Sequence, residues 1–306
     1  LRSLVGLGDV YKRQCIHIQS VTYMHPDKDV LFSNVSFSMG KGEKVALIGN
    51  NGSGKSTLMQ LITKELSPSE GEVICLEPPY YIPQHFGQFN HLTIAGALRI
   101  EGKIQALHAI LQGDVSVEHF TVLDDDWDIE EKAVAALHEW GLPGVPLSHP
   151  MHLLSGGEKT KVFLAGIALH SPSFILMDEP TNHLDAESID WLEQHLQQYE
   201  GTVICITHDR YFLDHVAGWI LELDRGEGIP WKGNYSSWLE QKTKRMEMEE
   251  KTASKRRKTL ERELEWVRMA PKARQAKGKA RLNSYDKLLN EDQKEKEEKL
   301  EIFIPN

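Results

Sequence analysis

The feature that constrains this chain most is the segment 49–57, which reads GNNGSGKST. It fits the pattern GxxxxGK[ST] and lies between a short apolar run at 45–48 and a stretch of helical period at 58–63. Glycines let such a loop turn tightly and point its amide N–H groups at phosphate, and the following helix N-terminus adds partial positive charge. The segment therefore predicts a phosphate-binding loop in which Lys55 reaches the β- and γ-phosphates and Ser56 binds Mg²⁺.

Two adjacent carboxylates, Asp178 and Glu179, directly follow the apolar run 174–177. Ligands in open α/β sheets bind at the carboxyl ends of the strands, which is where this order would place both acids. We expect Asp178 to hold Mg²⁺ through water and Glu179 to orient and deprotonate the attacking water. The alternative is that both acids merely end the strand in solvent and have no catalytic role. The phosphate-binding loop in the same chain argues against this alternative.

The order of elements predicts an α/β fold. From 158 to 223, helices alternate with short apolar strands, which indicates a mainly parallel sheet flanked by helices. We see no long charged helical pair between Gln84 and Ser155. The strands expected along the chain are 16–18, 21–23, 31–39, 45–48, 73–76, 80–82, 174–177, 203–207 and 219–223.

The tail differs in charge from the rest of the chain. Residues 241–306 carry a net charge of +6 and the first 240 carry −16. After Ser236 the sequence is polar and helical, and Pro271 interrupts the helical pattern. We therefore expect a globular part at 15–235 and a helical hairpin at 236–302, with the basic segment 268–281 at its tip. Charge alone fits an arm for a polyanion and a solvated helix surface equally well.

Composition excludes several classes of protein. The net charge of −10 over 306 residues excludes a wholly basic nucleic-acid binder, and no apolar run approaches the roughly 18 residues of a membrane span. The three cysteines form no CxxC pair, so we expect no disulfide framework or zinc site and a reducing, cytoplasmic compartment. Asp9–Gln14 (DVYKRQ) can be read as a translated sequencing adapter, so we expect residues 1–14 to be an artefact and leave them out of the fold.

Four further motifs name a family. LSGGE stands at 154–158, Gln84 follows YYIP, NHLD follows the two carboxylates, and His208 ends ICITH. In this order they resemble the ATP-binding-cassette (ABC) nucleotide-binding domain over about 15–232, and DEPTNHLD and THDRYFLD resemble the ABC-F subfamily. From about Asp185 onward the chain is similar to one particular member of that subfamily.

The resemblance implies an ABC-type P-loop NTPase domain, with a mainly parallel sheet, an antiparallel β subdomain and a helical subdomain, followed by a long α-helical hairpin. ABC-F members pair two cassettes on one chain and act on ribosomes. This chain has one GK[ST] loop and one LSGGE, and it stops where the second cassette should begin. We therefore expect a fragment that hydrolyses ATP weakly and needs a second cassette, either the missing half or another copy.

The resemblance also implies roles for single residues, with ATP and Mg²⁺ as cofactors. Tyr23 would stack on adenine, Gln84 would sense Mg²⁺ and water, and His208 would contact the γ-phosphate. LSGGE would serve a nucleotide held by a different cassette, although Ser155 and Glu158 also fit a helix capping box. The catalytic set is Glu179, His208 and Gln84; the metal set is Ser56, Gln84 and Asp178; and the nucleotide-binding set is Tyr23, Gly49, Asn50, Asn51, Gly52, Ser53, Gly54, Lys55, Ser56, Thr57, Ser155, Gly156, Gly157 and Asp185.

The basic segment would bind RNA phosphates with little base reading. The resemblance implies contact with P-site tRNA and ribosomal RNA, so that ATP would switch ribosome binding and regulate translation. Two alternatives stay open. The chain is the ATPase subunit of a membrane transporter, or it is a non-enzymatic RNA-binding scaffold whose shape is held by bound ATP. The six residues expected to contact RNA are Arg268, Lys272, Arg274, Lys277, Lys279 and Arg281.

Overall fold

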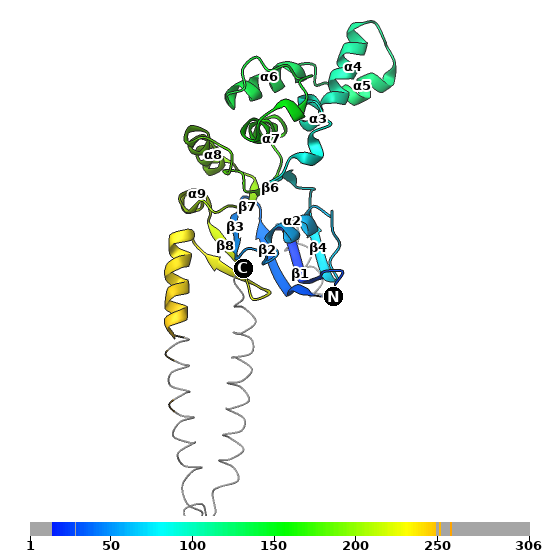
Figure 1. The fold of residues 1–306 in the computed structure, drawn as a ribbon. Coiled ribbons are helices and arrows are strands. Elements are labelled where there is room, and N and C mark those ends of the chain that lie inside the picture. Colours follow the sequence, from blue (N-terminus) through cyan, green and yellow to red (C-terminus); the bar gives the residue numbers. More distant parts are fainter. Residues whose placement is uncertain (1–13, 28, 249–250, 252–257, 259–306) are drawn as a thin grey trace, which may run out of the picture. The chain divides into compact units, whose positions relative to one another are not determined.

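A computed structural model describes residues 14–27, 29–248, 251 and 258 (Figure 1). The chain divides into two units, Leu1–Trp238 and Leu239–Asn306, which are described separately. Of the second unit, residues 239–248 are helical. The expected adapter segment, except for Gln14, and the expected basic tip lie outside the described residues. Within the described part, no helix is both long and apolar enough to cross a membrane.

The main sheet of the first unit has six strands in the order β5-β6-β7-β3-β8-β9. The first five are parallel, and β9 is antiparallel to β8. Residues of β6 and β7 are buried throughout, which explains their unbroken apolar runs FILM and VICI. This confirms the predicted parallel sheet. The strands are β3 (Lys44–Gly49), β5 (Tyr80–Ile82), β6 (Phe174–Asp178), β7 (Thr202–Ile206), β8 (Trp219–Asp224) and β9 (Glu227–Lys232).

A second, antiparallel sheet of three strands has the order β2-β1-β4. The two short strands expected at 16–18 and 21–23 are one strand, β1, whose pairing is irregular near Ser20, a non-glycine residue with φ of 48°. This sheet is the antiparallel β subdomain that the family resemblance implied. Its strands are β1 (Gln14–Met24), β2 (Val30–Gly40) and β4 (Glu70–Cys75), and they share a core with the buried face of helix α2 (Lys55–Ile62).

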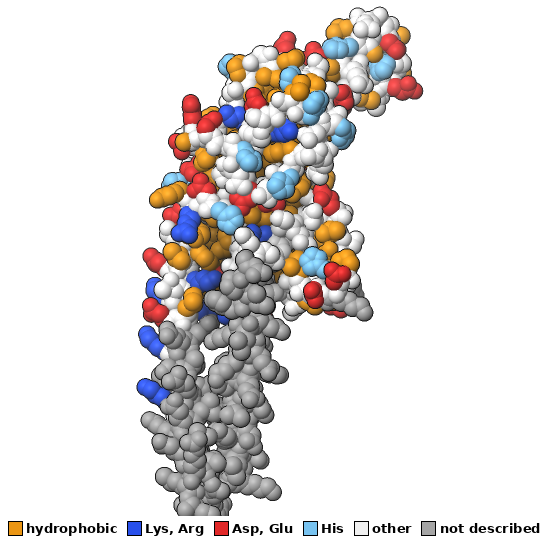
Figure 2. Space-filling view, in the orientation of Figure 1, with side chains coloured by type: hydrophobic (Ala, Val, Ile, Leu, Met, Phe, Trp, Pro, Cys, Tyr) orange, Lys and Arg blue, Asp and Glu red, His pale blue; other side chains and the backbone are white. Residues whose placement is uncertain are grey.

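A helical region lies between β5 and β6 in the sequence. Its helices α4 and α5 form a short pair that projects from the rest of the region (Figure 1). Leu111, Val115 and Val117, at and between the adjoining ends of these two helices, are exposed. Figure 2 shows both acidic and histidine side chains on the surface of the helical region. The two helices of the pair have 11 and 7 residues, so the pair is too short to be a long charged arm. The helices are α3 (Ile94–Ala97), α4 (Glu101–Leu111), α5 (Val117–Leu123), α6 (Ile129–Glu139) and α7 (Gly156–His170).

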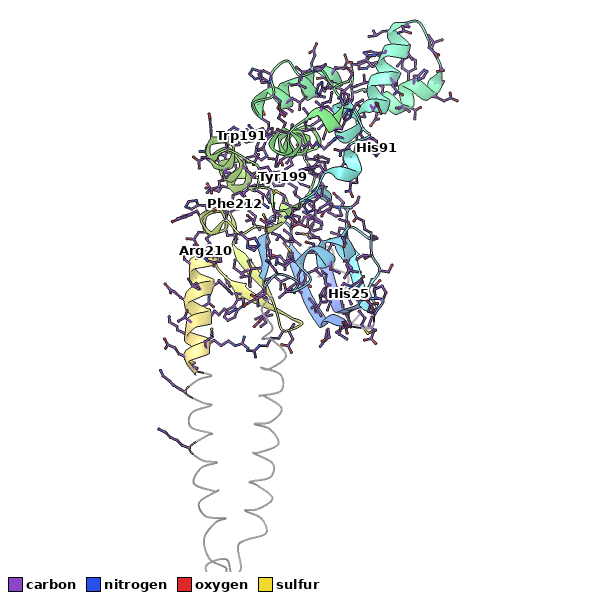
Figure 3. The ribbon with its side chains drawn as sticks, in the orientation of Figure 1. His25, His91, Trp191, Tyr199, Arg210 and Phe212 are labelled. Atoms are coloured by element: carbon purple, nitrogen blue, oxygen red, sulfur yellow. The ribbon has the colours of Figure 1, made fainter. Side chains whose placement is uncertain are left out.

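The last residues of the first unit are fixed to helix α9 (Arg210–Val216), which follows β7. Asp214 of α9 accepts hydrogen bonds from the backbone N (2.7 Å) and the hydroxyl (2.8 Å) of Ser236. Trp238 donates its indole N–H to buried Glu222 of β8 at 3.1 Å. Phe212 of α9 is buried, whereas Arg210 is exposed and lies 5.9 Å from the Tyr235 ring (Figure 3). The end of this unit is therefore held by both polar and aromatic contacts.

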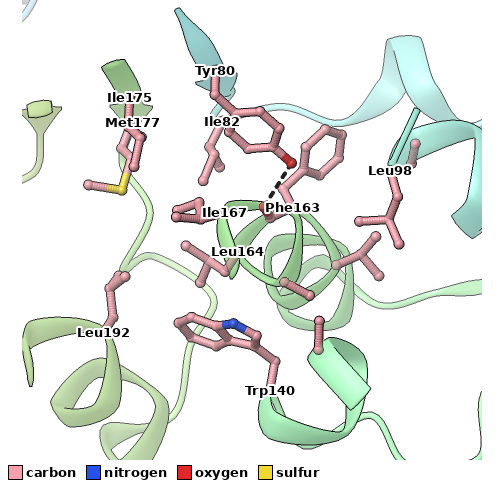
Figure 4. Close-up of a cluster of buried hydrophobic side chains, with 14 of the residues drawn as sticks. Tyr80, Ile82, Leu98, Trp140, Phe163, Leu164, Ile167, Ile175, Met177 and Leu192 are labelled. Carbon is pink, nitrogen blue, oxygen red and sulfur yellow. Dashed lines mark hydrogen bonds between the residues drawn. The ribbon is translucent and has the colours of Figure 1, made fainter. Parts of the chain in front are cut away.

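The core between the main sheet and α7 positions the LSGGE segment, because that segment begins α7. Figure 4 shows Tyr80 of β5 reaching over α7, where its hydroxyl donates to the Phe163 carbonyl at 2.9 Å. Gly166 leaves room for this ring, since a Cβ at that position would collide with the Tyr80 hydroxyl. Trp140 and Leu192, the latter from helix α8 (Ala186–Gln198), close the other side of the cluster. The buried Tyr80 hydrogen bond and the close helix approach thus fix α7 against the sheet.

Candidate nucleotide-binding site

The loop between β3 and α2 has the geometry of an anion cradle. Gly52 and Gly54 have φ of 82° and 95°, a region that favours glycine. A Cβ at Gly54 would also lie 2.8 Å from the Phe32 ring, so a larger residue would displace the loop. Lys55 donates from Nζ to the carbonyls of Gly49 (2.9 Å) and Asn50 (3.0 Å), which keeps its ammonium at the loop. Burial lowers the pKa of Lys55, and the nearby Glu179 and Asp178 oppose that effect.

Ser56 and Asp178 meet beside this loop. Asp178 is the last residue of β6 and is 4% exposed, and Ser56 lines the same pocket and lowers its pKa. Burial raises the pKa of Asp178, while Ser56 and Lys55 partly counter it. A hydroxyl and a carboxylate are oxygen ligands of the kind that Mg²⁺ takes together with water and substrate phosphates. In the described residues there is no group of three or more His, Cys, Asp or Glu side chains that could hold a metal by themselves. The pair therefore fits a metal held jointly with phosphate.

Glu179 and His208 form the second polar pair. The Glu179 carboxylate lies 3.4 Å from His208 Nε2 and accepts a hydrogen bond from the His208 backbone N at 3.3 Å. Glu179 has a positive φ of 52° and donates its own N–H to Ile206 at 2.7 Å, so the backbone is held in an uncommon conformation. Burial raises the pKa of Glu179, with His208 opposing it. A carboxylate with a raised pKa is suited to take a proton from water near neutral pH.

One pocket of about 510 Å³ joins these groups. It brings together the predicted residues of the loop, the carboxylate pair, Gln84 and His208. Tyr23 is not among the described residues that line it; in its place are His25 and Leu31, which our interpretation of the sequence missed. The family resemblance implied Tyr23, and nothing in the local sequence marked the histidine two residues later. The lining residues are His25, Leu31, Asn51, Gly52, Gly54, Lys55, Ser56, Thr57, Gln84, Asp178, Glu179, Asn182, Ile206 and His208.

The LSGGE segment does not line this pocket. Ser155 caps α7 and forms the predicted capping box: its hydroxyl accepts from the Glu158 N–H at 3.3 Å, and Glu158 accepts from the Ser155 N–H at 2.8 Å. A Cβ at Gly157 would collide with the His183 carbonyl, so the helix start packs closely on the NHLD segment. Asp185 caps α8 through Ser188 N–H (2.8 Å) and pairs with Lys161 (3.2 Å). The phosphate-binding loop and the LSGGE segment of this chain therefore belong to two separate places in the fold.

The buried carboxylate Asp178 should cost stability at neutral pH. Its pKa is raised in the folded state, so its favourable contribution is present below the unfolded pKa and is lost as pH rises through the folded value. We expect Asp178→Asn to raise the urea midpoint of the nucleotide-free chain at pH 7.5, with a difference that shrinks toward pH 4. The measurement is urea unfolding followed by circular dichroism at several pH values.

Asp185→Asn is the matched control, for which we expect a change of the opposite sign in the urea midpoint. Its pKa is lowered to about 2 by hydrogen bonds from Ser188 and Lys161, so its contribution is present at neutral pH and is lost as pH falls toward 2. Asp185→Asn should therefore lower the urea midpoint at pH 7.5. A stability loss of equal size in both variants at pH 7.5 would show that burial does not strain Asp178.

Comparison with known protein families supports the expected class. Two models described as ABC transporter match residues 32–182 and 221–303. Together with the relatives described next, they show that the chain belongs to the ABC-F family of ATP-binding cassette ATPases.

The chain is similar to the energy-dependent translational throttle protein EttA of several bacteria. It is 42% identical to that of Haemophilus influenzae over 304 residues, which cover 92% of this chain and 54% of that protein. It is 37% identical to that of Mycobacterium tuberculosis over 297 residues, covering 90% and 52%. It is 49% identical to the ATP-binding protein ChvD of Rhizobium radiobacter over 179 residues, covering 58% and 62%. The chain spans about half the length of the throttle proteins that it matches.

Solved structures support the fold. The ATP-binding subunit of an ABC transporter is 22% identical with a TM-score of 0.57, covering 71% of this chain and 90% of that one. An ATP-binding cassette solved as a dimer with ADP and Pi is 24% identical with a TM-score of 0.53, covering 71% and 98%. These likenesses confirm the predicted cassette fold of the first unit.

Proposed function

We propose that this chain binds Mg-ATP in the pocket between β3, α2 and β6, and hydrolyses it once a second cassette supplies an LSGGE segment. The observation that carries the proposal is the meeting of Lys55, the Ser56–Asp178 pair and the Glu179–His208 pair in one pocket. Each pair has the chemistry of one task in phosphoryl transfer. We propose the activity for which the throttle proteins are named for this chain as well.

The tasks divide among the residues as follows. The loop amides and Lys55 bind the triphosphate, and Ser56 and Asp178 hold the metal, which neutralises phosphate charge when bound. Glu179 holds the attacking water and takes its proton, and Gln84 lies in the same pocket to sense metal and water. His208 fixes the Glu179 carboxylate and contacts the γ-phosphate. Each of these roles uses a side chain that lines the pocket.

The LSGGE segment then acts on a nucleotide in a different cassette. Ser155, Gly156 and Gly157 lie outside the pocket that holds the loop, and Ser155 is exposed at the start of α7. An exposed hydroxyl and helix-start amides are suited to bind phosphate. The second cassette is either a further part of a longer chain or another copy, and Asp185 couples the two sites.

The partner that we propose is the ribosome, in the cytoplasm. The relatives are named as translational throttle proteins, and the positive charge of the segment 268–281 suits RNA phosphates. Contact with P-site tRNA and ribosomal RNA would make ATP a switch for translation. The ATPase subunit of a membrane transporter would have the same nucleotide site, but that alternative does not explain the basic segment.

Changing the basic segment tests the ribosome proposal. Replacing Arg268, Lys272, Arg274, Lys277, Lys279 and Arg281 by glutamine should weaken ribosome association by about tenfold or more at moderate salt and flatten its salt dependence. ADP affinity should stay unchanged, because the nucleotide pocket lies in the first unit. Co-sedimentation with 70S particles over a salt series is the measurement. Glutamine at six positions of the mixed-charge segment 291–299 serves as the control. Unchanged ribosome association in the basic-segment variant would refute the assignment.

A further inference from the structure

The turns that follow β6 and β7 are tied to each other at the carboxyl edge of the sheet. Asp178 of β6 pairs with Ile206 of β7, so both strands end at the same level. The Glu179 N–H donates to the Ile206 carbonyl at 2.7 Å, and the His208 N–H donates to the Glu179 carboxylate at 3.3 Å. Glu179 is therefore bonded to both residues that flank Thr207.

Two buried hydroxyls join the same two turns. The Oγ1 atoms of Thr181 and Thr207 lie 2.8 Å apart, and the two residues are 8% and 5% exposed. The backbone N–H of Asp209 donates to Thr207 Oγ1 at 3.1 Å, so this hydroxyl contacts two groups at once. Neither threonine is among the described residues that line the nucleotide pocket. The pair therefore belongs to the support of the pocket and not to its surface.

Asp209 fixes the other end of this network. Its carboxylate accepts hydrogen bonds from the backbone N–H groups of Tyr211 (3.0 Å) and Phe212 (3.2 Å), which caps α9. Phe212, labelled in Figure 3, is fully buried. A buried hydroxyl that loses its partner costs free energy, so the contact between Thr181 and Thr207 favours one arrangement of the two turns.

We propose that the Thr181–Thr207 hydroxyl pair is the positioning unit of the Glu179–His208 pair. Glu179 has a positive φ of 52°, a conformation that persists only where the surrounding contacts hold it. Thr181 stands two residues after Glu179. Thr207 directly precedes His208, so a contact between the two hydroxyls holds both members of the proposed catalytic pair. This inference rests on the proposed hydrolysis and adds which residues keep the base aimed at its water.

Turnover and affinity separate a positioning role from a binding role. We expect Thr207→Val, which keeps the shape and removes the hydroxyl, to lower kcat for ATP about tenfold, with KM and Mg-ADP affinity changed less than about threefold. Thr207→Ser keeps the hydroxyl and should restore kcat. Thr181→Val removes the same contact from the other turn and should lower kcat by a similar factor, so the test does not depend on one variant folding. Steady-state phosphate release and calorimetric titration with Mg-ADP are the measurements.

Thr202→Val is the matched control, because Thr202 is a fully buried threonine at the other end of β7. Its hydroxyl donates to the Gly40 carbonyl at 3.2 Å and accepts from the Gly42 N–H at 3.1 Å. This variant should lower the urea midpoint and leave kcat unchanged. A double variant gives the second readout: if the hydroxyl pair acts through Glu179, adding Thr207→Val to Glu179→Gln should cause no further loss of turnover.

Three outcomes would overturn the inference: kcat of folded Thr207→Val and Thr181→Val within about threefold of the wild type, an equal loss of kcat in Thr202→Val, or losses that multiply in the double variant. The last would show that the hydroxyl pair supports the fold without acting through Glu179. A wild-type chain that releases no phosphate from ATP at any concentration would instead refute the proposed hydrolysis. The two failures are therefore distinguishable.

Discussion

Replacing Lys55 by alanine is expected to reduce ADP and ATP affinity about a hundredfold. Among the described residues that line the pocket, Lys55 alone is a lysine or arginine, and its ammonium already lies against the loop carbonyls at 2.9 and 3.0 Å. A charge-assisted hydrogen bond contributes about 1.5–3 kcal/mol. The upper end of this range corresponds to roughly a hundredfold in affinity. Calorimetric titration with Mg-ADP measures the loss.

Lys41→Ala is the control for this change. Lys41 is exposed and lies in the turn before β3, at the opposite end of that strand from the loop. It should bind ADP as the wild type does. A folded Lys55→Ala chain whose ADP affinity stays within about threefold of the wild type would show that the phosphates bind elsewhere.

Glu179→Gln is expected to lower ATP turnover by roughly a hundredfold or more while leaving ATP affinity nearly unchanged. Removing a general base costs about 10²–10⁴ in rate, and the amide keeps the shape and the contact to the His208 N–H. Because hydrolysis would no longer release the closed form, this variant should also accumulate an ATP-bound assembly in size-exclusion chromatography. The measurement is steady-state phosphate release beside ATP affinity.

Glu200→Gln is the matched control, since Glu200 is exposed and precedes β7, away from the carboxyl end of the sheet. It should turn over ATP at the wild-type rate. Turnover in Glu179→Gln within about threefold of the wild type would exclude Glu179 as the base, because loss of a base costs far more.

The loop end of the pocket could be predicted from sequence because its signals are local. The loop 49–57 and the carboxylates Asp178 and Glu179 each stand at the end of a strand, and parallel strands bring those ends to one edge. The sheet then brings Ser56 and Asp178 into one pocket. The capping box at Ser155 is likewise a pattern within four residues, and the structure confirms it.

The parts that escaped prediction depend on contacts across the chain. Strand β9 carries Pro230, which argues against a strand, yet β9 is at the sheet edge, where a missing N–H is tolerated. His25 enters the pocket only because the β1–β2 turn folds toward the phosphate loop, and no local pattern encodes that approach. Tyr23, which the family resemblance implied, packs against the rings of His25 and Phe32.

The most direct test is ATP turnover in mixtures of two variants, Lys55→Ala and Ser155→Arg, with the wild type measured over about three decades of concentration. If each site needs LSGGE from another cassette, wild-type turnover per chain should rise with concentration. Each variant alone should be inactive, and mixing should restore activity through the one composite site that keeps both intact parts. Constant full turnover per chain at every wild-type concentration, or wild-type activity of Ser155→Arg alone, would contradict a site completed by a second cassette.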